Sequence, residues 1–204
     1  MPLDTFFNLN KDKQNQIIEA AINEFTNNTY KEVKISNIVR SAKIPRGSFY
    51  QYFSDKKDLY KYLINGIMAQ RKLEFLSPKL SNPSDLSFLD LFRELYKSGL
   101  DFAIAYPKMI LITRNLLLDR SMFDELLKDS LQIARTYYRS YIKRDKEKGI
   151  IDDTIDTETL IDIVIQNTTT IAFDELVAKK DIDKEIMLEK LEKIIHILKK
   201  GIER

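Results

Sequence analysis

The sequence predicts an all-α fold, and three observations carry this prediction. Apolar residues recur at intervals of three and four along nearly the whole chain, as they do in amphipathic helices. No segment alternates apolar and polar residues as a half-buried β-strand does. Proline, serine, asparagine and aspartate, which begin and end helices, fall between the apolar stretches. The chain has 204 residues, 44% of them hydrophobic, which is enough to bury a core.

Three helices are predicted in the N-terminal part, and the last two of them are short. An apolar stripe between Gln14 and Phe25 predicts the first helix, which two asparagines then end. A second helix is expected over about 34–41. Pro45 stands where a third helix can begin, because its fixed φ suits a first turn. We expect that helix to continue to about Phe53.

A long fourth helix is expected from the cap residues Ser54 and Asp55 to about Leu76. The segment 77–84, rich in proline and serine, then interrupts the helical pattern. Five further helices are expected beyond it, at about 86–105, 107–118, 121–148, 157–179 and 184–202. The predicted domains are residues 1–54, a connecting helix at 55–76, and a C-terminal helical domain at 77–204.

The composition argues against most classes of enzyme. The chain has no cysteine, which excludes thiol catalysis and cysteine-ligated metals. It has one histidine, His196, which makes a multi-histidine metal site or a histidine-based triad very hard to build, and we expect His196 to be a packed or interface residue. Five glycines leave no glycine-rich phosphate loop. We therefore predict that the chain is not an enzyme and has no metal and no cofactor.

The sequence also predicts where the protein works. The first ten residues lack the basic start and apolar run of a signal peptide. The longest apolar runs fall far short of the roughly 18 residues that a transmembrane helix needs. We expect a cytoplasmic protein with no membrane partner.

Positive charge is concentrated near the predicted short helices. Residues 1–76 carry 12 lysines and arginines against 8 acidic residues, while the rest of the chain carries 21 against 23. Between Arg40 and Lys57, five basic residues face a single acid, Asp55. Such a local excess on a nearly neutral chain favours a surface that faces a polyanion, although a solvated helical face would show the same excess.

Two short helices joined by a tight turn, between two longer ones, form the plan of a helix-turn-helix. In this motif one face of the second short helix must dock inward, and the other must reach bases and phosphates. Phe49 and Phe53 are spaced to dock inward. The outward positions would be Arg46, Ser48, Tyr50, Gln51 and Tyr52, while Gly47 would let the backbone approach a phosphate closely.

These residues resemble the DNA-binding domain of TetR-family transcriptional regulators. The resemblance covers about residues 11–60 and is most specific between Arg46 and Leu59. It implies a homodimer whose recognition helices enter successive major grooves of a palindromic operator in double-stranded DNA. The positions that it implies for base or nearby phosphate contact are Arg46, Ser48, Gln51 and Tyr52, with Tyr50 and Lys56 on the phosphate backbone. Lys43 and Gly47 complete the set of candidate DNA-binding residues.

Three positions depart from the family pattern. Lys43 stands where the turn usually has glycine, and Pro45 stands where serine or threonine usually caps the third helix. Thr29 replaces a common glycine after the first helix. An altered turn and a missing capping hydroxyl are therefore expected.

The resemblance further implies that the C-terminal domain binds a small effector, and an apolar or aromatic compound would suit its side chains. The candidate effector-pocket residues are Phe92, Tyr96, Phe102, Tyr106, Met109, Phe123, Tyr137, Tyr138 and Phe173. The same residues recur at helical spacing and could equally be ordinary core. The sequence leaves both interpretations open.

The resemblance also implies that the last two helices pair across a two-fold axis as a four-helix bundle. The candidate interface residues are Ile161, Val164, Ile165, Leu191, Ile194, Ile195 and Leu198. The function predicted from all of this is a ligand-responsive repressor, although the sequence does not separate repression from activation. The alternative is a protein-interaction module of the same fold that has lost specific DNA binding.

Overall fold

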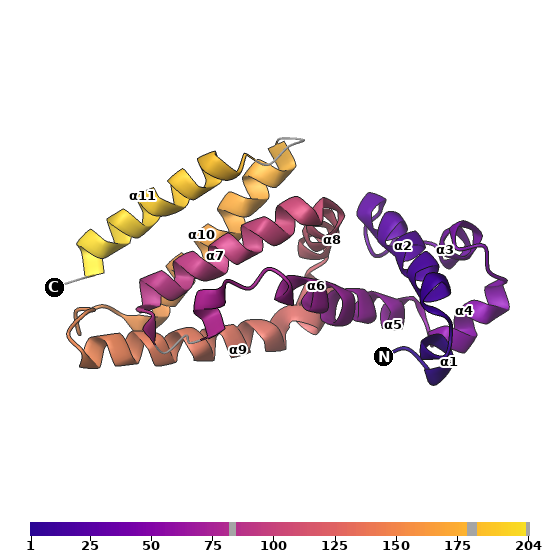
Figure 1. The fold of residues 1–204 in the computed structure, drawn as a ribbon, viewed down its shortest axis with the longest axis horizontal. Coiled ribbons are helices and arrows are strands. Elements are labelled where there is room, and N and C mark those ends of the chain that lie inside the picture. Colours follow the sequence, from indigo (N-terminus) through magenta and orange to yellow (C-terminus); the bar gives the residue numbers. More distant parts are fainter. Residues whose placement is uncertain (82–84, 179–182, 203–204) are drawn as a thin grey trace. The chain divides into compact units, whose positions relative to one another are not determined.

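The computed structural model describes residues 1–81, 85–178 and 183–202, and it describes only the backbone at Ser81, Arg120 and 168–178. All regular elements in these ranges are helical, which confirms the all-α prediction (Figure 1). The α-helices are α1 (Asp4–Phe7), α2 (Lys11–Asn27), α3 (Ile35–Ser41), α4 (Arg46–Tyr52), α5 (Lys56–Lys61), α6 (Ala69–Leu73), α7 (Phe88–Ala105), α8 (Pro107–Leu117), α9 (Arg120–Glu147), α10 (Thr157–Ala178) and α11 (Lys184–Ile202). Two further segments are helical with other geometries, the π-helical η1 (Tyr62–Met68) and the 3₁₀-helical η2 (Pro78–Ser81).

The contacts within the chain divide it into two compact units. The first unit contains Met1–Glu74 together with Tyr106–Lys128, and the second contains Phe75–Ala105 together with Asp129–Arg204. Helix α8 and the first turns of α9 thus pack with the N-terminal helices. This division follows packing, whereas the domain borders at 54 and 76 followed sequence punctuation and stay predictions.

The core of the first unit lies between α2, α3 and α4. Ile17 and Phe25 of α2, Ile38 of α3 and Phe49 of α4 are all buried, as is Phe53 just after α4. The inward orientation predicted for the two phenylalanines is therefore confirmed. These two side chains point one side of α4 into the core, and Arg46, Tyr50 and Gln51 on its other side are exposed.

The predicted fourth helix differs in its middle from the continuous α-helix that was expected. It consists of α5, the π-helical η1 and α6 in succession. The ring of Tyr62 lies against Gly66 so closely that a Cβ atom at Gly66 would stand 2.9 Å from Cδ2 of Tyr62. Only glycine accommodates the ring there, and capping signals at the helix start could not reveal this packing.

Helix α1 is an element that sequence analysis did not predict. It has a single turn, so it shows no apolar periodicity of its own. Its stability comes from Phe6, which is fully buried against the rings of Phe53 and Tyr62 at centroid distances of 5.0 and 5.6 Å. Such tertiary support is invisible in a short window of sequence.

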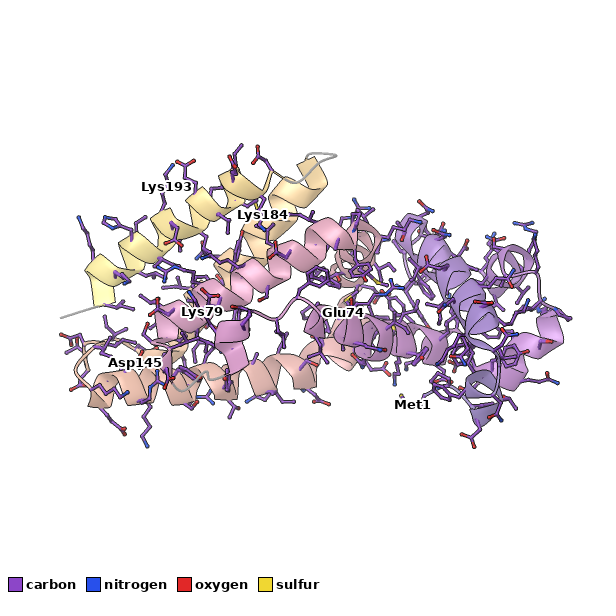
Figure 2. All side chains as sticks on the ribbon, in the orientation of Figure 1. Met1, Glu74, Lys79, Asp145, Lys184 and Lys193 are labelled. Atoms are coloured by element: carbon purple, nitrogen blue, oxygen red, sulfur yellow. The ribbon has the colours of Figure 1, made fainter. Side chains whose placement is uncertain are left out.

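The core of the second unit joins α7, α10, α11 and the part of α9 that belongs to this unit. Its buried side chains include Phe88, Phe92, Ile142, Leu160, Ile161 and Leu191. Asp145 of α9 meets the start of α7, where its Oδ2 accepts a hydrogen bond of 2.6 Å from the amide of Phe88 (Figure 2). Ion pairs link α7 to α11, namely Arg93–Glu192 at 2.8 Å and Lys184–Asp101 at 2.5 Å.

The segment that precedes α7 is anchored on that helix. The Ser77 hydroxyl donates a 2.7 Å hydrogen bond to Glu94, and Lys79 of η2 reaches the same carboxylate at 3.3 Å (Figure 2). These partners, the serine first, hold the pKa of Glu94 below its usual value although the side chain is nearly buried. Ser77 and Lys79 are therefore held to α7 by their contacts with Glu94.

Two features are absent from the described residues. No helix in the described ranges is long and apolar enough to cross a membrane. Among the side chains that the structure describes, no three acidic or histidine residues group so that they could hold a metal ion.

Candidate nucleic-acid interface

The turn between α3 and α4 has an unusual backbone at Lys43. Its φ is +47°, the left-handed region that a glycine adopts without cost. Lys13 of α2 supports this turn, since its ammonium group donates to the carbonyls of Ala42 and Lys43 at 3.3 and 3.4 Å. The altered turn expected from the sequence is thus a lysine in a glycine conformation. Nothing in the sequence pattern singled out Lys13.

We predict that Lys43→Gly stabilises the protein while weakening DNA binding. Relief of the left-handed strain, of about 1–2 kcal/mol, exceeds the conformational entropy cost of glycine, of about 0.5–1 kcal/mol. Urea unfolding should therefore show a gain of about 0.5–1 kcal/mol. Loss of the charge should reduce the steepness of the salt dependence of DNA binding by about one unit.

Lys43→Asn is the matched control, because asparagine tolerates a positive φ and also lacks the charge. It should lower the salt dependence as much as Lys43→Gly does. An unchanged free energy of unfolding in both variants would contradict the strain, and an unchanged salt dependence would contradict a phosphate contact.

Helix α4 presents the predicted contact residues on its open side. Arg46, Gly47 and Gln51 are exposed, Tyr50 is 47% exposed, and Ser48 and Tyr52 are half-buried. Pro45 precedes the helix with φ −60° and ψ 146°, and no side chain caps the start. A Cβ atom built on Gly47 would meet nothing within 4 Å, so the backbone there is open to a ligand. The helix-turn-helix thus offers cationic, hydroxyl and amide groups together.

Lys56 is placed differently from the other candidates. Its ammonium group donates to the carbonyl oxygens of Tyr30 and Val33 at 2.6 and 3.0 Å, with that of Lys31 at 3.4 Å. It also lies 4.5 Å from the centre of the Tyr30 ring. This partial burial lowers the pKa of Lys56. An ammonium group has three donors, and all three already face the chain, so this geometry favours support of the loop before α3 over a phosphate contact.

Comparisons with known proteins address the identity of this unit. The family model described as bacterial regulatory proteins, tetR family, matches residues 17–63, the stretch that contains the helix-turn-helix. A crystal structure of a TetR family transcriptional regulator from Chloroflexus aurantiacus J-10-FL matches the whole chain, with a TM-score of 0.79 and 27% identity over 100% of this chain and 99% of that one. Residues 17–63 thus form a DNA-binding domain of the TetR family.

Two more relatives extend the likeness of this TetR-family chain. The uncharacterized HTH-type transcriptional regulator YhgD of Bacillus subtilis (strain 168) is 23% identical over 188 residues, which are 89% of this chain and 93% of that protein. The transcriptional regulator FadR from Bacillus subtilis, solved in complex with stearoyl-CoA, shares the fold with a TM-score of 0.71 and 18% identity over 92% of this chain and 98% of that one. These relatives are named as regulators of transcription and not as enzymes, and together with the family model they support a DNA-binding transcriptional regulator of the TetR type.

The structure divides the candidate effector residues of this TetR-family member between the two units. Phe92, Tyr96, Phe102, Tyr137 and Tyr138 lie in the second unit, and Tyr106, Met109 and Phe123 lie in the first. Phe92, Tyr96, Phe102 and Met109 are buried, Tyr106, Phe123 and Tyr138 are half-buried, and Tyr137 is exposed. The side chain of Phe173 lies outside the described residues.

One of these residues lines an open groove on α9 of this TetR-family chain. The groove has a volume of about 550 Å³, and its described lining is Asp129, Gln132, Ile133, Thr136, Tyr137 and Ser140. Ile133 is 71% exposed in it. The Tyr137 hydroxyl lies 3.2 Å from that of Tyr141, and burial together with this neighbour raises the pKa of Tyr141 to about 12.

The candidate dimer residues also separate into two groups. Ile161, Val164, Leu191 and Ile195 are buried in the core of the second unit, so they already pack within one protomer. This packing favours other residues for the dimer face, and the assignment itself stays a prediction. Ile165 and Leu198 pack against the rim of that core, and Ile194 is half-buried. The apolar periodicity identified the inner stripe of each helix and could not show that α7 covers it.

Proposed function

We propose that this TetR-family regulator is a ligand-responsive repressor that binds a palindromic operator in double-stranded DNA as a homodimer. The observation that carries the proposal is the division of α4 into two sides. Phe49 is buried, while Arg46, Tyr50 and Gln51 stand in solvent on an exposed helix. Exposed arginine and glutamine side chains on a short helix can read base edges in a major groove.

The α4 side chains would make two kinds of contact with DNA, to bases and to phosphates. Arg46 is the candidate for bidentate contact with a guanine, and Gln51 for an adenine. The Tyr50 hydroxyl and the open backbone at Gly47 suit phosphate oxygens, which fix the register of the helix on the duplex. Ser48, Tyr52 and Lys43 would add contacts at the rim of the same surface.

A homodimer would place two such helices one helical turn of DNA apart, about 34–36 Å. For its interface we propose outward residues of the last two helices, in place of the buried stripe. Ile197 of α11 is 68% exposed and Ile163 of α10 is 39% exposed, while Ile194, which lies three positions before Ile197 on α11, is half-buried. Apolar side chains of this size gain free energy when a second copy covers them.

The proposed effector is a compound with an apolar body. The aromatic side chains that the second unit gathers, and the groove with Ile133 and Tyr137, support this class. The stearoyl-CoA in the FadR complex shows what one protein of the same fold accommodates. To turn occupancy of the operator from 99:1 to 1:99, an effector must favour the unbound state by about 5.5 kcal/mol.

The deciding experiment selects binding sites from randomised duplex DNA with the purified full chain and then titrates the winning site at several salt concentrations. We expect a palindromic winner whose affinity falls steeply with salt. Arg46→Ala should weaken binding by about 10–100-fold and relax the preference at one base pair in each half-site. Tyr50→Phe should weaken binding to all sequences alike. In a separate titration, stearoyl-CoA is added to the complex as a probe, to test whether a long acyl chain releases the DNA.

Lys128→Ala is the matched control, because Lys128 is an exposed basic residue outside the helix-turn-helix. It should leave the selected site and its affinity within about twofold, as surface charges remote from the DNA do. No enriched sequence, or equal binding by Arg46→Ala, would overturn the proposal and favour a protein-interaction module of the same fold.

A further inference from the structure

The C-terminal end of α4 is closed by a segment from outside the helix-turn-helix. A helix leaves its last carbonyl groups without partners of its own. In α4 the carbonyl of Tyr52 accepts a hydrogen bond of 2.9 Å from the amide of Leu3, and that of Gln51 accepts one from the hydroxyl of Thr5. Both donors lie at the beginning of the chain, 46 or more residues away.

The same segment packs against α4 through an aromatic cluster. Phe6 is fully buried, with ring centroids 5.0 Å from Phe53 and 6.3 Å from Tyr52. A third ring, Tyr62 of η1, lies 5.6 Å from Phe6. Phe6 thus contacts the end of the recognition helix and the helix that follows it, so it sets the angle at which α4 leaves the core.

The segment is itself held firmly. The side-chain amide of Gln14, which is buried in α2, donates to the carbonyls of Phe7 and Leu9 at 3.1 and 2.8 Å. Asn10 caps α2 by accepting a 2.8 Å hydrogen bond from the amide of Lys13. Residues Leu3–Phe7 are therefore tied to α2 at one end and to α4 at the other.

We propose that Leu3–Phe7 form a brace that positions the C-terminal half of the recognition helix, with Thr5 and Phe6 as positioning residues for base reading by Gln51 and Tyr52. A helix of seven residues has too few internal hydrogen bonds to stay rigid alone. Leu3 and Thr5 of the brace donate hydrogen bonds to the last carbonyl groups of α4. Gln51 and Tyr52 lie at this end of the helix. Its effect on base reading rests on the proposed operator binding, whereas its effect on α4 itself does not.

The brace is tested first without DNA, by hydrogen exchange of the full chain. In Phe6→Ala and Thr5→Val we expect faster exchange of the amides near the end of α4, above all that of Phe53, which donates to the carbonyl of Phe49 at 2.9 Å. Exchange in α2 should stay as in the wild type. Thr5→Ser keeps the hydroxyl and should restore slow exchange, and Phe6→Leu keeps an apolar filling if Phe6→Ala does not fold.

The second readout is base discrimination on the selected operator. Thr5→Val should lose about fivefold in affinity, the usual effect of one hydrogen bond. The loss of discrimination, about tenfold per base pair, should be confined to the base pairs that depend on Gln51 or Tyr52. Discrimination at the base pair read by Arg46, and the salt dependence, should not change. A general loss of stability would instead lower the affinity and the discrimination at every base pair together.

The possible outcomes separately test the brace, its positioning role and the proposed operator binding. Unchanged exchange at the end of α4 in Phe6→Ala overturns the brace whatever the DNA result is. Faster exchange with an even loss of discrimination at every base pair overturns the positioning role. If the wild type selects no DNA sequence, the proposed operator binding fails, and the exchange experiment alone still decides whether the brace exists.

Discussion

Replacement of Asn115 by alanine is expected to destabilise the first unit by about 3 kcal/mol, because it removes a buried amide that serves several carbonyl groups at once. Asn115 of α8 is 6% exposed. Its Nδ2 donates to the carbonyl oxygens of Phe25, Thr26 and Asn28 at 3.1, 3.2 and 3.1 Å. These carbonyls lie at the C-terminal end of α2, where no following turn of the helix supplies amide donors for them.

The loss should appear in urea unfolding followed by circular dichroism, and as a lower affinity for DNA at temperatures near the transition. Asn115→Asp keeps the volume and replaces the donor by an acceptor, so it should cost at least as much. Asn27→Ala is the matched control, since Asn27 is exposed and donates only within its own helix, to the carbonyl of Asn23. A midpoint for Asn115→Ala within error of the wild type would show that water replaces the amide without cost.

Asp145→Ala is the second change with a large expected effect, about 3–4 kcal/mol in the second unit. Asp145 is 1% exposed, and its two oxygens have separate partners. Oδ2 accepts from the amide of Phe88 at the start of α7, and Oδ1 accepts from the guanidinium of Arg144 at 3.1 and 2.8 Å. Removal of the carboxylate would take this acceptor from the buried amide of Phe88 and one ion-pair partner from the guanidinium of Arg144.

Thermal and urea unfolding should both show this loss, and Asp145→Asn should lie between the alanine variant and the wild type because it keeps an acceptor for Phe88. Glu147→Ala provides the control, since Glu147 is an exposed acid on the same helix whose nearest cation, Lys143, is 3.9 Å away. It should change stability by less than about 0.5 kcal/mol. Equal effects of the two alanine variants would mean that Asp145 does not cap α7.

Local signals in the sequence were enough for most of the helices and for the DNA-facing helix. Pro45 marked the start of α4, and Phe49 and Phe53 marked its inner side, because a fixed φ and a spacing of four residues act within one or two turns. The same locality limits what such signals can predict. The spacing of Ile161 and Leu191 identified an apolar face, but it carried no information on what covers that face.

By itself, the sequence determined the all-α class, the helix-turn-helix and the residues on the solvent side of α4, since each depends on neighbours within a few positions. Tertiary structure alone decided the brace on α4, the enclosure of the Lys56 ammonium group by backbone carbonyls, and the caps made by Asn115 and Asp145. Asp145 and Phe88 are 57 positions apart, and Asn115 and Phe25 are 90 apart. Such pairs form only when the packing of whole helices brings them together, so no local pattern along the chain records them.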